Sequence, residues 1–426
     1  MGTELENRFN SYCDTIVEAL AHADRNQPCR WYLKGLMLPG ERKSVEPMAA
    51  RVQPANVRSA HQSMHHLVAD APWSDRAVLS AVAEQVLPRL LGSEGPVWWI
   101  IDDTGFPKRG KHSVGVARQY CGQTGKRDNC QIAVSLSIAN ASGSLPIDYQ
   151  LYLPREWAED AERRDKCGVP DDVVFETKPA LAMQQIEAAL SAGYRRGVVL
   201  ADAAYGGDTA WREQLAGHGL SYAVGVRSTT SVWWGSYQPV PEPKSTSRRG
   251  RPRCRVQRDA THQPISVWDL ARELPKRAWR EVSWRDGVAG RLSSRFARVR
   301  VRAAKEDRQR DEEWLIIEWP EGAEEPAHYW FSNLAKSITW EAMIDTVMGR
   351  WRIERDYQEL KQELGLGQYE GRNWRGFHHH ASLCIAAYGF LVLERLSGSK
   401  KNAARFEMPA VPKSYRPRGA QSHATS

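Results

Sequence analysis

The sequence predicts a mixed α/β protein built from more than one domain, and three observations support this. Apolar residues recur at helical spacing through the first 92 residues. Short continuous apolar runs then follow at 97–101 and 197–201, as expected of strands buried on both faces. Residues 227–336 hold further β-prone runs separated by Pro, Gly and charge clusters. A chain of 426 residues also exceeds the roughly 250–300 residues at which one hydrophobic core stops growing.

Composition limits the class of protein and its partners. The formal net charge is +8 and the pI about 9.1, which favours an anionic partner. The seven cysteines are odd in number, scattered and without a C-x-x-C pair, so we expect neither a zinc site nor a disulfide framework. No apolar run reaches the ~18 residues of a membrane span, and the N-terminus lacks a signal sequence. A cytoplasmic, nucleoid-associated protein without a membrane partner is expected.

Residues 1–92 form the first predicted domain. Leu5, Phe9, Tyr12, Ile16 and Leu20 are spaced for one buried helix face. The segment also carries a set of cations that suits a DNA-binding helical domain, although a helical packing domain fits nearly as well; these cations are Arg42, Lys43, Arg51 and Arg58.

Residues 93–226 form the first part of a predicted catalytic core. The strand at 97–101 ends in Asp102 and Asp103 and is followed by a basic, Gly-rich loop at 107–119 that contains Lys108 and Arg109. The sequence then predicts strands at 131–139 and 145–153, a helix at 178–192, a strand at 197–201 that ends in Asp202, a helix at 211–216 and a last strand at 222–226. This order is that of an RNase H-like core, in which the ends of the first and fourth strands lie side by side.

Residues 227–336 are predicted to be a β-rich insertion domain. Its most basic run, 247–255, contains Arg249 and Arg251 around an Arg-Gly-Arg-Pro sequence. Such a run suits insertion into a narrow minor groove of DNA. An exposed loop without a specific role explains it equally well.

Residues 337–396 complete the predicted core with a helix at about 339–364. At about 100° per residue, Arg350, Glu354 and Lys361 lie within roughly 40° of one another on this helix. The helix phase places a second polar set toward solvent, namely Arg352, Arg355, Asp356 and Glu359. Two interpretations explain why Arg350, Glu354 and Lys361 share one side of the helix. They can form ion pairs on a solvated face, or Glu354 can be a metal ligand between two cations that hold a phosphate backbone.

The last apolar helix opens with His378, His379 and His380, and a basic polar tail at 397–426 closes the chain. Three consecutive residues of a helix point in different directions, so they cannot converge on one metal ion. We expect these histidines to cap the helix or to contact neighbouring backbone instead.

Three carboxylates emerge as the candidate catalytic centre. Asp102 and Asp202 follow adjacent buried strands, and Glu354 is on a helix beside the sheet. Hard oxygen ligands of this kind select Mg²⁺ or Mn²⁺. Two such ions can activate an attacking oxygen and stabilise a leaving one on a phosphodiester. Asp103 is the adjacent alternative to Asp102, because an offset of one residue in the strand would exchange them.

The chain resembles bacterial insertion-sequence transposases of the DDE superfamily, in the branch with a long β-rich insertion before the last carboxylate. The resemblance is carried by the segments at 101–108, 122–131 and 201–206 and by a signature of Tyr, two residues, Arg, three residues, Glu, six residues and Lys. Arg350, Glu354 and Lys361 occupy the last three positions of that signature, and Val347 stands at the Tyr position.

The resemblance implies a function and a set of site residues. Asp102, Asp202 and Glu354 would be the catalytic metal ligands, and Arg350 and Lys361 would hold DNA near the scissile phosphate. It further implies hydrolysis at the transposon ends, attack of the freed 3′-hydroxyl on target DNA, and a homodimer or larger synaptic assembly. An RNase H-like structure-selective DNA endonuclease and a non-catalytic, domesticated DNA-binding relative are the alternatives.

Overall fold

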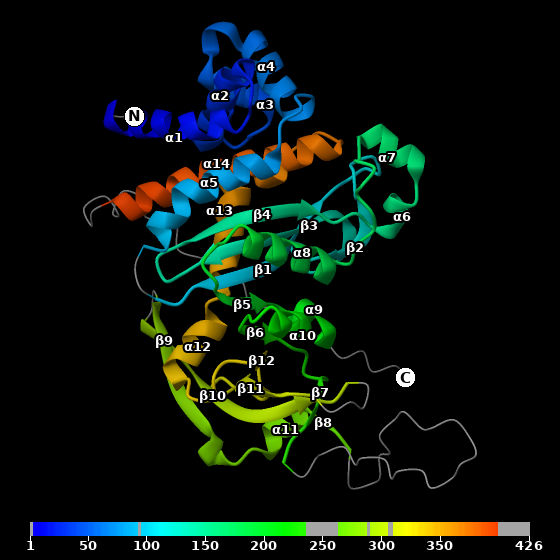
Figure 1. The fold of residues 1–426 in the computed structure, drawn as a ribbon, viewed down its shortest axis with the longest axis vertical. Coiled ribbons are helices and arrows are strands. Elements are labelled where there is room, and N and C mark those ends of the chain that lie inside the picture. Colours follow the sequence, from blue (N-terminus) through cyan, green and yellow to red (C-terminus); the bar gives the residue numbers. More distant parts are fainter. Residues whose placement is uncertain (1–2, 93–94, 236–262, 288–289, 306–309, 399–426) are drawn as a thin grey trace.

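The computed structural model describes residues 3–92, 95–235, 263–287, 290–305 and 310–398 (Figure 1). Arg249, Arg251 and most of the predicted tail lie outside the described residues. The sequence prediction of a mixed α/β, RNase H-like fold is confirmed. None of the described helices is both long and apolar enough to cross a membrane.

The N-terminal helices lie at one end of the molecule and pack against the last helix, α14 (Trp374–Ser397) (Figure 1). Ser74 caps the fifth helix, because its hydroxyl accepts a hydrogen bond from the Ala77 N–H at 3.1 Å. The five helices are α1 (Thr3–Glu18), α2 (Asn26–Met37), α3 (Val45–Val52), α4 (Val57–Ala69) and α5 (Asp75–Leu90).

One mixed sheet runs through the rest of the described chain, with 12 strands in the order β2-β3-β1-β5-β6-β12-β11-β10-β7-β8, β4 on β3 and β9 on β10. Its core strands are β1 (Trp98–Pro107), β2 (Ala117–Cys121), β3 (Lys126–Ala139), β4 (Ser144–Leu151), β5 (Val198–Ala201) and β6 (Tyr222–Gly225). β1 and β5 are parallel neighbours, as predicted for the first and fourth strands. β2 replaces part of the predicted loop, because it pairs with an N-terminal extension of β3.

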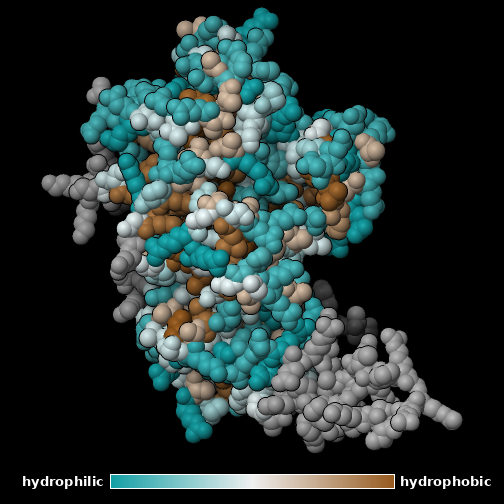
Figure 2. All heavy atoms as spheres, in the orientation of Figure 1, coloured by the Kyte–Doolittle hydropathy of each residue, from teal (hydrophilic) through white to brown (hydrophobic). Residues whose placement is uncertain are grey.

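The predicted insertion contributes strands that continue this same sheet. They are β7 (Ser231–Trp233), β8 (Ile265–Ser266), β9 (Trp279–Gly287), β10 (Gly290–Ala303), β11 (Glu312–Glu318) and β12 (His328–Ser332). The join is between β12 and β6, which pair antiparallel with Phe331 opposite Val224. Hydrophobic packing is therefore continuous from the N-terminal helices through the core to the insertion. Figure 2 shows hydrophilic residues over most of one face, with hydrophobic residues visible mainly along its middle.

Shorter helices connect and cover the strands. Between β4 and β6 they are α6 (Arg155–Ala158), α7 (Ala161–Cys167), α8 (Lys178–Ser191), α9 (Ala203–Gly206) and α10 (Thr209–Gly217), and α11 (Val267–Glu273) follows β8. Thr177 caps α8 by accepting a hydrogen bond from the Ala180 N–H at 3.3 Å. This cap fixes the start of α8 at Lys178, which reaches Asp103 of β1.

The single helix predicted at 339–364 is instead two, α12 (Trp340–Met348) and α13 (Trp351–Gln362). The break occurs at Gly349, which packs against the indole of Trp98. A Cβ atom at Gly349 would lie 2.9 Å from that ring, so the close approach requires glycine.

The prediction that Asp356 and Glu359 face solvent is wrong, because both residues are buried. The Asp356 carboxylate accepts hydrogen bonds from the hydroxyls of Ser144 and Tyr388. The carboxylate of Glu359 accepts one from Arg395 at 2.7 Å. Partners on β4 and α14 therefore permit burial of carboxylates that a helix wheel assigns to solvent.

The three consecutive histidines contact backbone, as predicted, from within α14. His378 Nδ1 lies 2.9 Å from the Trp374 carbonyl oxygen, and His380 Nε2 lies 3.0 Å from that of Gly365. His379 stacks on Trp73 with ring centroids 3.6 Å apart. The His378 contact lies within α14, whereas those of His379 and His380 join α14 to the elements around it.

Candidate active site

Two aspartates meet where β1 and β5 run side by side. The parallel register pairs Ile100 with Leu200, so Asp102 and Asp202 each stand two residues further along. Carboxylate oxygens of Asp102, Asp103 and Asp202 all lie within 4.8 Å of one another. Among the described residues this is the one group of three or more carboxylate, imidazole or thiol side chains with that spacing.

Asp102 and Asp103 have different neighbours, because successive side chains of a strand point to opposite faces. Asp102 is paired across the sheet with Ser135, whose hydroxyl is hydrogen-bonded to that of Tyr357 on α13. Asp103 forms an ion pair with Lys178 at the start of α8. Asp102 therefore faces α13, and Asp103 faces α8.

Arg350 connects Asp102 to Glu354. Its Nη2 lies 2.7 Å from Asp102 Oδ1, and its Nη1 lies 3.8 Å from Glu354 Oε1. The Glu354 side chain is 68% exposed and does not belong to the three-aspartate cluster. One guanidinium thus stands between the carboxylate of α13 and that of β1.

The pKa of Asp102 is raised to about 7, mainly by burial; Arg350 opposes the shift, and the negative charges of Asp103 and Asp202 add to it. A raised pKa means that the ionised carboxylate is unfavourable in these surroundings. Burial is the main reason, so a bound cation that stabilises the ionised carboxylate would suit this position.

The turn that follows β5 places Asp202. Its Oδ1 accepts a hydrogen bond from the Ala204 N–H at 2.8 Å, which caps α9. α9 packs closely on β6 at Gly225, where a Cβ atom would lie 3.0 Å from the backbone nitrogen of Ala203.

Tyr205 of this turn has a buried hydroxyl without a hydrogen-bond partner in the described structure. Burial and the three neighbouring aspartates raise the pKa of Tyr205 well above its usual value.

The predicted DNA-binding cations lie in different surroundings. Lys361 donates from Nζ to the Gly105 carbonyl at 3.0 Å and to Gln123 Oε1 at 3.2 Å. Lys108 Nζ donates to the Tyr369 carbonyl at 3.1 Å, and burial lowers the pKa of Lys108. Arg109 is exposed on the loop after β1. Arg249 and Arg251 fall outside the described part of the chain.

Three residues near the cluster were missed by the sequence prediction. Lys178 reaches Asp103 from 75 positions away, and no local pattern announces that contact. Ser135 could have been found, because strand pairing places it opposite Asp102. Tyr205 lies in the turn after Asp202, where proximity in sequence was the available signal.

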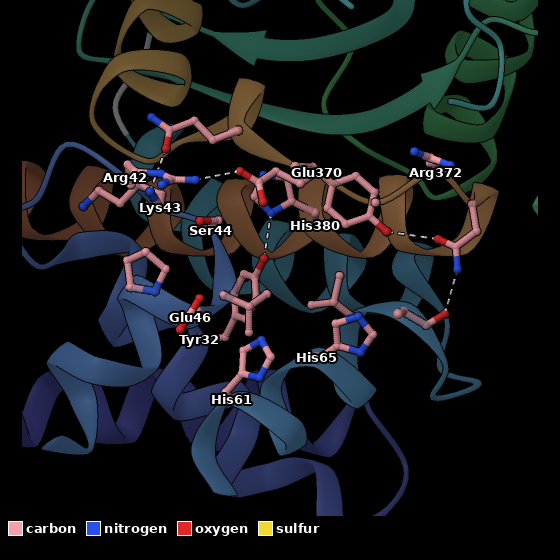
Figure 3. Close-up of a pocket in the computed structure, with 18 of the residues that line it drawn as sticks. Tyr32, Arg42, Lys43, Ser44, Glu46, His61, His65, Glu370, Arg372 and His380 are labelled. Carbon is pink, nitrogen blue, oxygen red and sulfur yellow. Dashed lines mark hydrogen bonds and ion pairs between the residues drawn. The ribbon is translucent and has the colours of Figure 1, made fainter. Parts of the chain in front are cut away.

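A separate cavity of about 590 Å³ lies between the N-terminal helices and residues 368–373 (Figure 3). Figure 3 shows two of its polar contacts, Arg42 with Glu370 at 3.1 Å and Tyr32 with His380 at 2.8 Å. None of the predicted catalytic carboxylates lines it. We therefore place the candidate active site at the carboxylate cluster and not in this cavity.

Comparison with known protein families places this cluster in context. Residues 15–291 match the family described as DDE superfamily endonuclease. The chain belongs to this superfamily. The matched segment of this DDE-superfamily chain contains Asp102, Asp103 and Asp202 and ends before Glu354.

A curated relative agrees with that membership. Over 172 residues the chain is 31% identical to the probable transposase for insertion sequence element IS701 from Microchaete diplosiphon. The aligned region covers 40% of this DDE-superfamily chain and 42% of that relative. The chain thus spans less than half the length of the transposase that it matches.

Proposed function

We propose that this protein is a DNA transposase that hydrolyses a phosphodiester at each transposon end and then transfers the 3′-hydroxyl strand into target DNA. The observation that carries the proposal is the carboxylate arrangement. Asp102 and Asp202 stand together at neighbouring strands, and Glu354 is separated from Asp102 by one guanidinium. The matched family and the IS701 relative support it.

The donor set fits a divalent cation. Three carboxylates within 4.8 Å offer hard oxygen ligands, which suit Mg²⁺ or Mn²⁺. The raised pKa of Asp102 reflects burial and negative charge that a cation would offset. We assign Asp102, Asp202 and Glu354 as the residues that would hold two such ions. Asp102 is favoured over Asp103 because it faces α13, the helix that carries Glu354, whereas Asp103 faces α8 and pairs with Lys178.

The residues around the metal site have separate roles in this proposal. When bound, divalent cations would activate the attacking oxygen and offset charge on the scissile phosphate. Arg350 would exchange its contact with Asp102 for a phosphate oxygen of the DNA, since a guanidinium binds both groups well. Lys361 and the neighbouring cations Lys108 and Arg109 would hold the backbone of the DNA beyond the site.

Duplex DNA is the proposed partner, both as transposon end and as target. A net charge of +8 supports attraction to a polyanion. Joining two ends at one target requires two active sites, so we propose a homodimer or larger synaptic assembly associated with the nucleoid. The N-terminal helices and the basic run with Arg249 and Arg251 are proposed as additional DNA contacts.

The test is a cleavage and joining assay on duplexes that carry the ends of the encoding element, with Mg²⁺ or Mn²⁺. The expected result is nicking at the element end and joining of pre-cut ends to a target plasmid. Asp102→Asn, Asp202→Asn and Glu354→Gln should each lower cleavage at least ~10³-fold while DNA binding persists. Cleavage without joining would indicate a structure-selective nuclease. Binding without cleavage would indicate a non-catalytic relative.

A further inference from the structure

A β-hairpin curls beside the candidate active site. We call residues 117–130 the rim hairpin; it comprises β2, the turn that follows and the start of β3. Cys121 packs against Gly105 of β1, where a Cβ atom would lie 2.5 Å from the Cys121 Sγ. Gly105 is three residues beyond Asp102, or about 10 Å along the strand.

The same hairpin is tied to the helix that carries Glu354. Lys361, seven residues after Glu354 on α13, donates from its ammonium both to the Gly105 carbonyl and to the Gln123 side chain of the hairpin turn. The rim hairpin therefore lies beside the carboxylate cluster, along the part of β1 that extends past its pairing with β5. β2 is an edge strand of the sheet, next to α6 and α7 in Figure 1.

The two faces of the rim hairpin differ in character. Cys121 and Cys130 are buried on its inner face, together with Ile132. Because side chains alternate along a strand, Tyr120 points outward, and its cross-strand partner is Arg127. Tyr120 is 62% exposed, one of two large hydrophobic side chains with such exposure in the described chain.

The outer face is also basic. Arg118 and Arg127 are exposed on this face, Lys126 is exposed at the hairpin turn on the side of Cys121, and no carboxylate of the described residues lies within 4.0 Å of their nitrogens. The one acid of the rim hairpin, Asp128, follows Arg127 and accepts a hydrogen bond from the Asn129 backbone N–H. Charged side chains on an edge strand can serve only to prevent pairing with other sheets. That role does not explain an exposed aromatic ring between two arginines.

We propose that the rim hairpin binds duplex DNA beside the scissile phosphate, with Arg118 and Arg127 on backbone phosphates and Tyr120 packed on a sugar or base edge. Arginines supply the charge-assisted contacts that phosphates prefer. A tyrosine presents a large apolar surface with a polar tip. The contact would lie within about 5 base pairs of the cleaved bond, since base pairs are spaced about 3.4 Å apart. The location near a cleaved bond rests on the proposed function.

The first test measures binding of a 30-base-pair duplex of arbitrary sequence by fluorescence anisotropy over a range of salt concentrations. Each arginine that contacts a phosphate contributes about 0.9 to the slope of log affinity against log salt. Arg118→Ala and Arg127→Ala should each reduce the slope by about that amount and weaken binding several-fold. Arg277→Ala, at an exposed position between α11 and β9, is the matched control and should leave the slope unchanged. Slopes for Arg118→Ala and Arg127→Ala equal to the wild-type slope would overturn the proposal.

The second test places a photo-crosslinking phenylalanine analogue at Tyr120. Val174, the other strongly exposed hydrophobic residue at 60%, serves as the control position. Crosslinks to DNA from position 120, and few from position 174, are expected; crosslinks to a second copy of the protein, or to neither, would refute the DNA contact. Wild-type cleavage with Mg²⁺ tests the proposed function separately, because an inactive protein can still show the crosslink and an active one can lack it.

Discussion

Arg350 and Asp102 form an ion pair at 2.7 Å between a helix start and a strand that are 248 positions apart. The pair places a positive charge where carboxylates of β1 and β5 converge. Arg350 also touches Glu354. The guanidinium thereby partly offsets the negative charge of the cluster in the structure.

Replacing Arg350 with Gln is expected to strengthen cation binding by the isolated protein. The guanidinium repels an incoming cation and competes for an Asp102 oxygen, and removing it should tighten Mn²⁺ binding about 3–10-fold, or roughly 1 kcal/mol. The measurement is calorimetric titration at pH 8.5, where Asp102, with its pKa raised to about 7, is ionised. Arg89→Gln, at an exposed position of α5, is the control. Weaker Mn²⁺ binding by the Arg350 variant would show that Arg350 supports the site.

Asp102 and Asp103 are expected to respond differently to the same substitution. Asp102→Asn should weaken Mn²⁺ binding at least ~100-fold, because it removes a carboxylate that faces Asp202 and α13. Asp103→Asn should weaken it less than ~10-fold, since Asp103 faces α8 and Lys178 and not the helix that carries Glu354. The same titration measures both variants, and the reverse order would exchange the two assignments.

Glu359→Ala is expected to destabilise the fold and to leave Mn²⁺ affinity within about twofold of wild type. The Glu359 carboxylate is buried and pairs with Arg395 at 2.7 Å and with Arg355 at 3.6 Å. Its loss should lower the free energy of unfolding by about 1–3 kcal/mol, because a buried network is broken while Arg395 stays partly solvated. Urea unfolding measures this effect. Gln362→Ala, exposed on the same helix, should change stability by less than about 0.5 kcal/mol.

The meeting of the two aspartates is a feature of this site that the sequence alone predicts. Asp102 and Asp202 could be predicted to meet, because apolar runs before them identify two buried strands and the order of elements makes those strands neighbours. Both signals are local or depend only on element order. The parallel pairing of β1 with β5 follows from them.

Other contacts depend on partners that the local sequence does not reveal. Asp356 is buried because Ser144, 212 positions away, and Tyr388 donate hydrogen bonds to it. Gly349, at the break between α12 and α13, packs against Trp98 from a strand far away in the sequence. A helix wheel contains no information about distant hydrogen-bond partners or packing. The sequence prediction therefore placed Asp356 toward solvent and treated α12 and α13 as one helix.

His380 is expected to make the fold sensitive to mild acid. Its Nε2 contacts the Gly365 carbonyl and its Nδ1 the Tyr32 hydroxyl, and burial lowers the pKa of His380 to about 4. An unfolded histidine has a pKa near 6.5, so between about pH 6.5 and 4 the unfolded chain binds a proton that the folded chain does not. The free energy of unfolding should fall as the pH drops through this range, by roughly 1.4 kcal/mol per pH unit from His380 alone.

Urea unfolding of His380→Gln tests this expectation. The variant should be less stable than wild type at pH 7, but its free energy of unfolding should fall by about 2 kcal/mol less than that of wild type between pH 6 and pH 4.5. His66→Gln, at an exposed position of α4, should keep the wild-type pH dependence; an unchanged dependence in the His380 variant would mean that the folded protein binds this proton as readily as the unfolded chain.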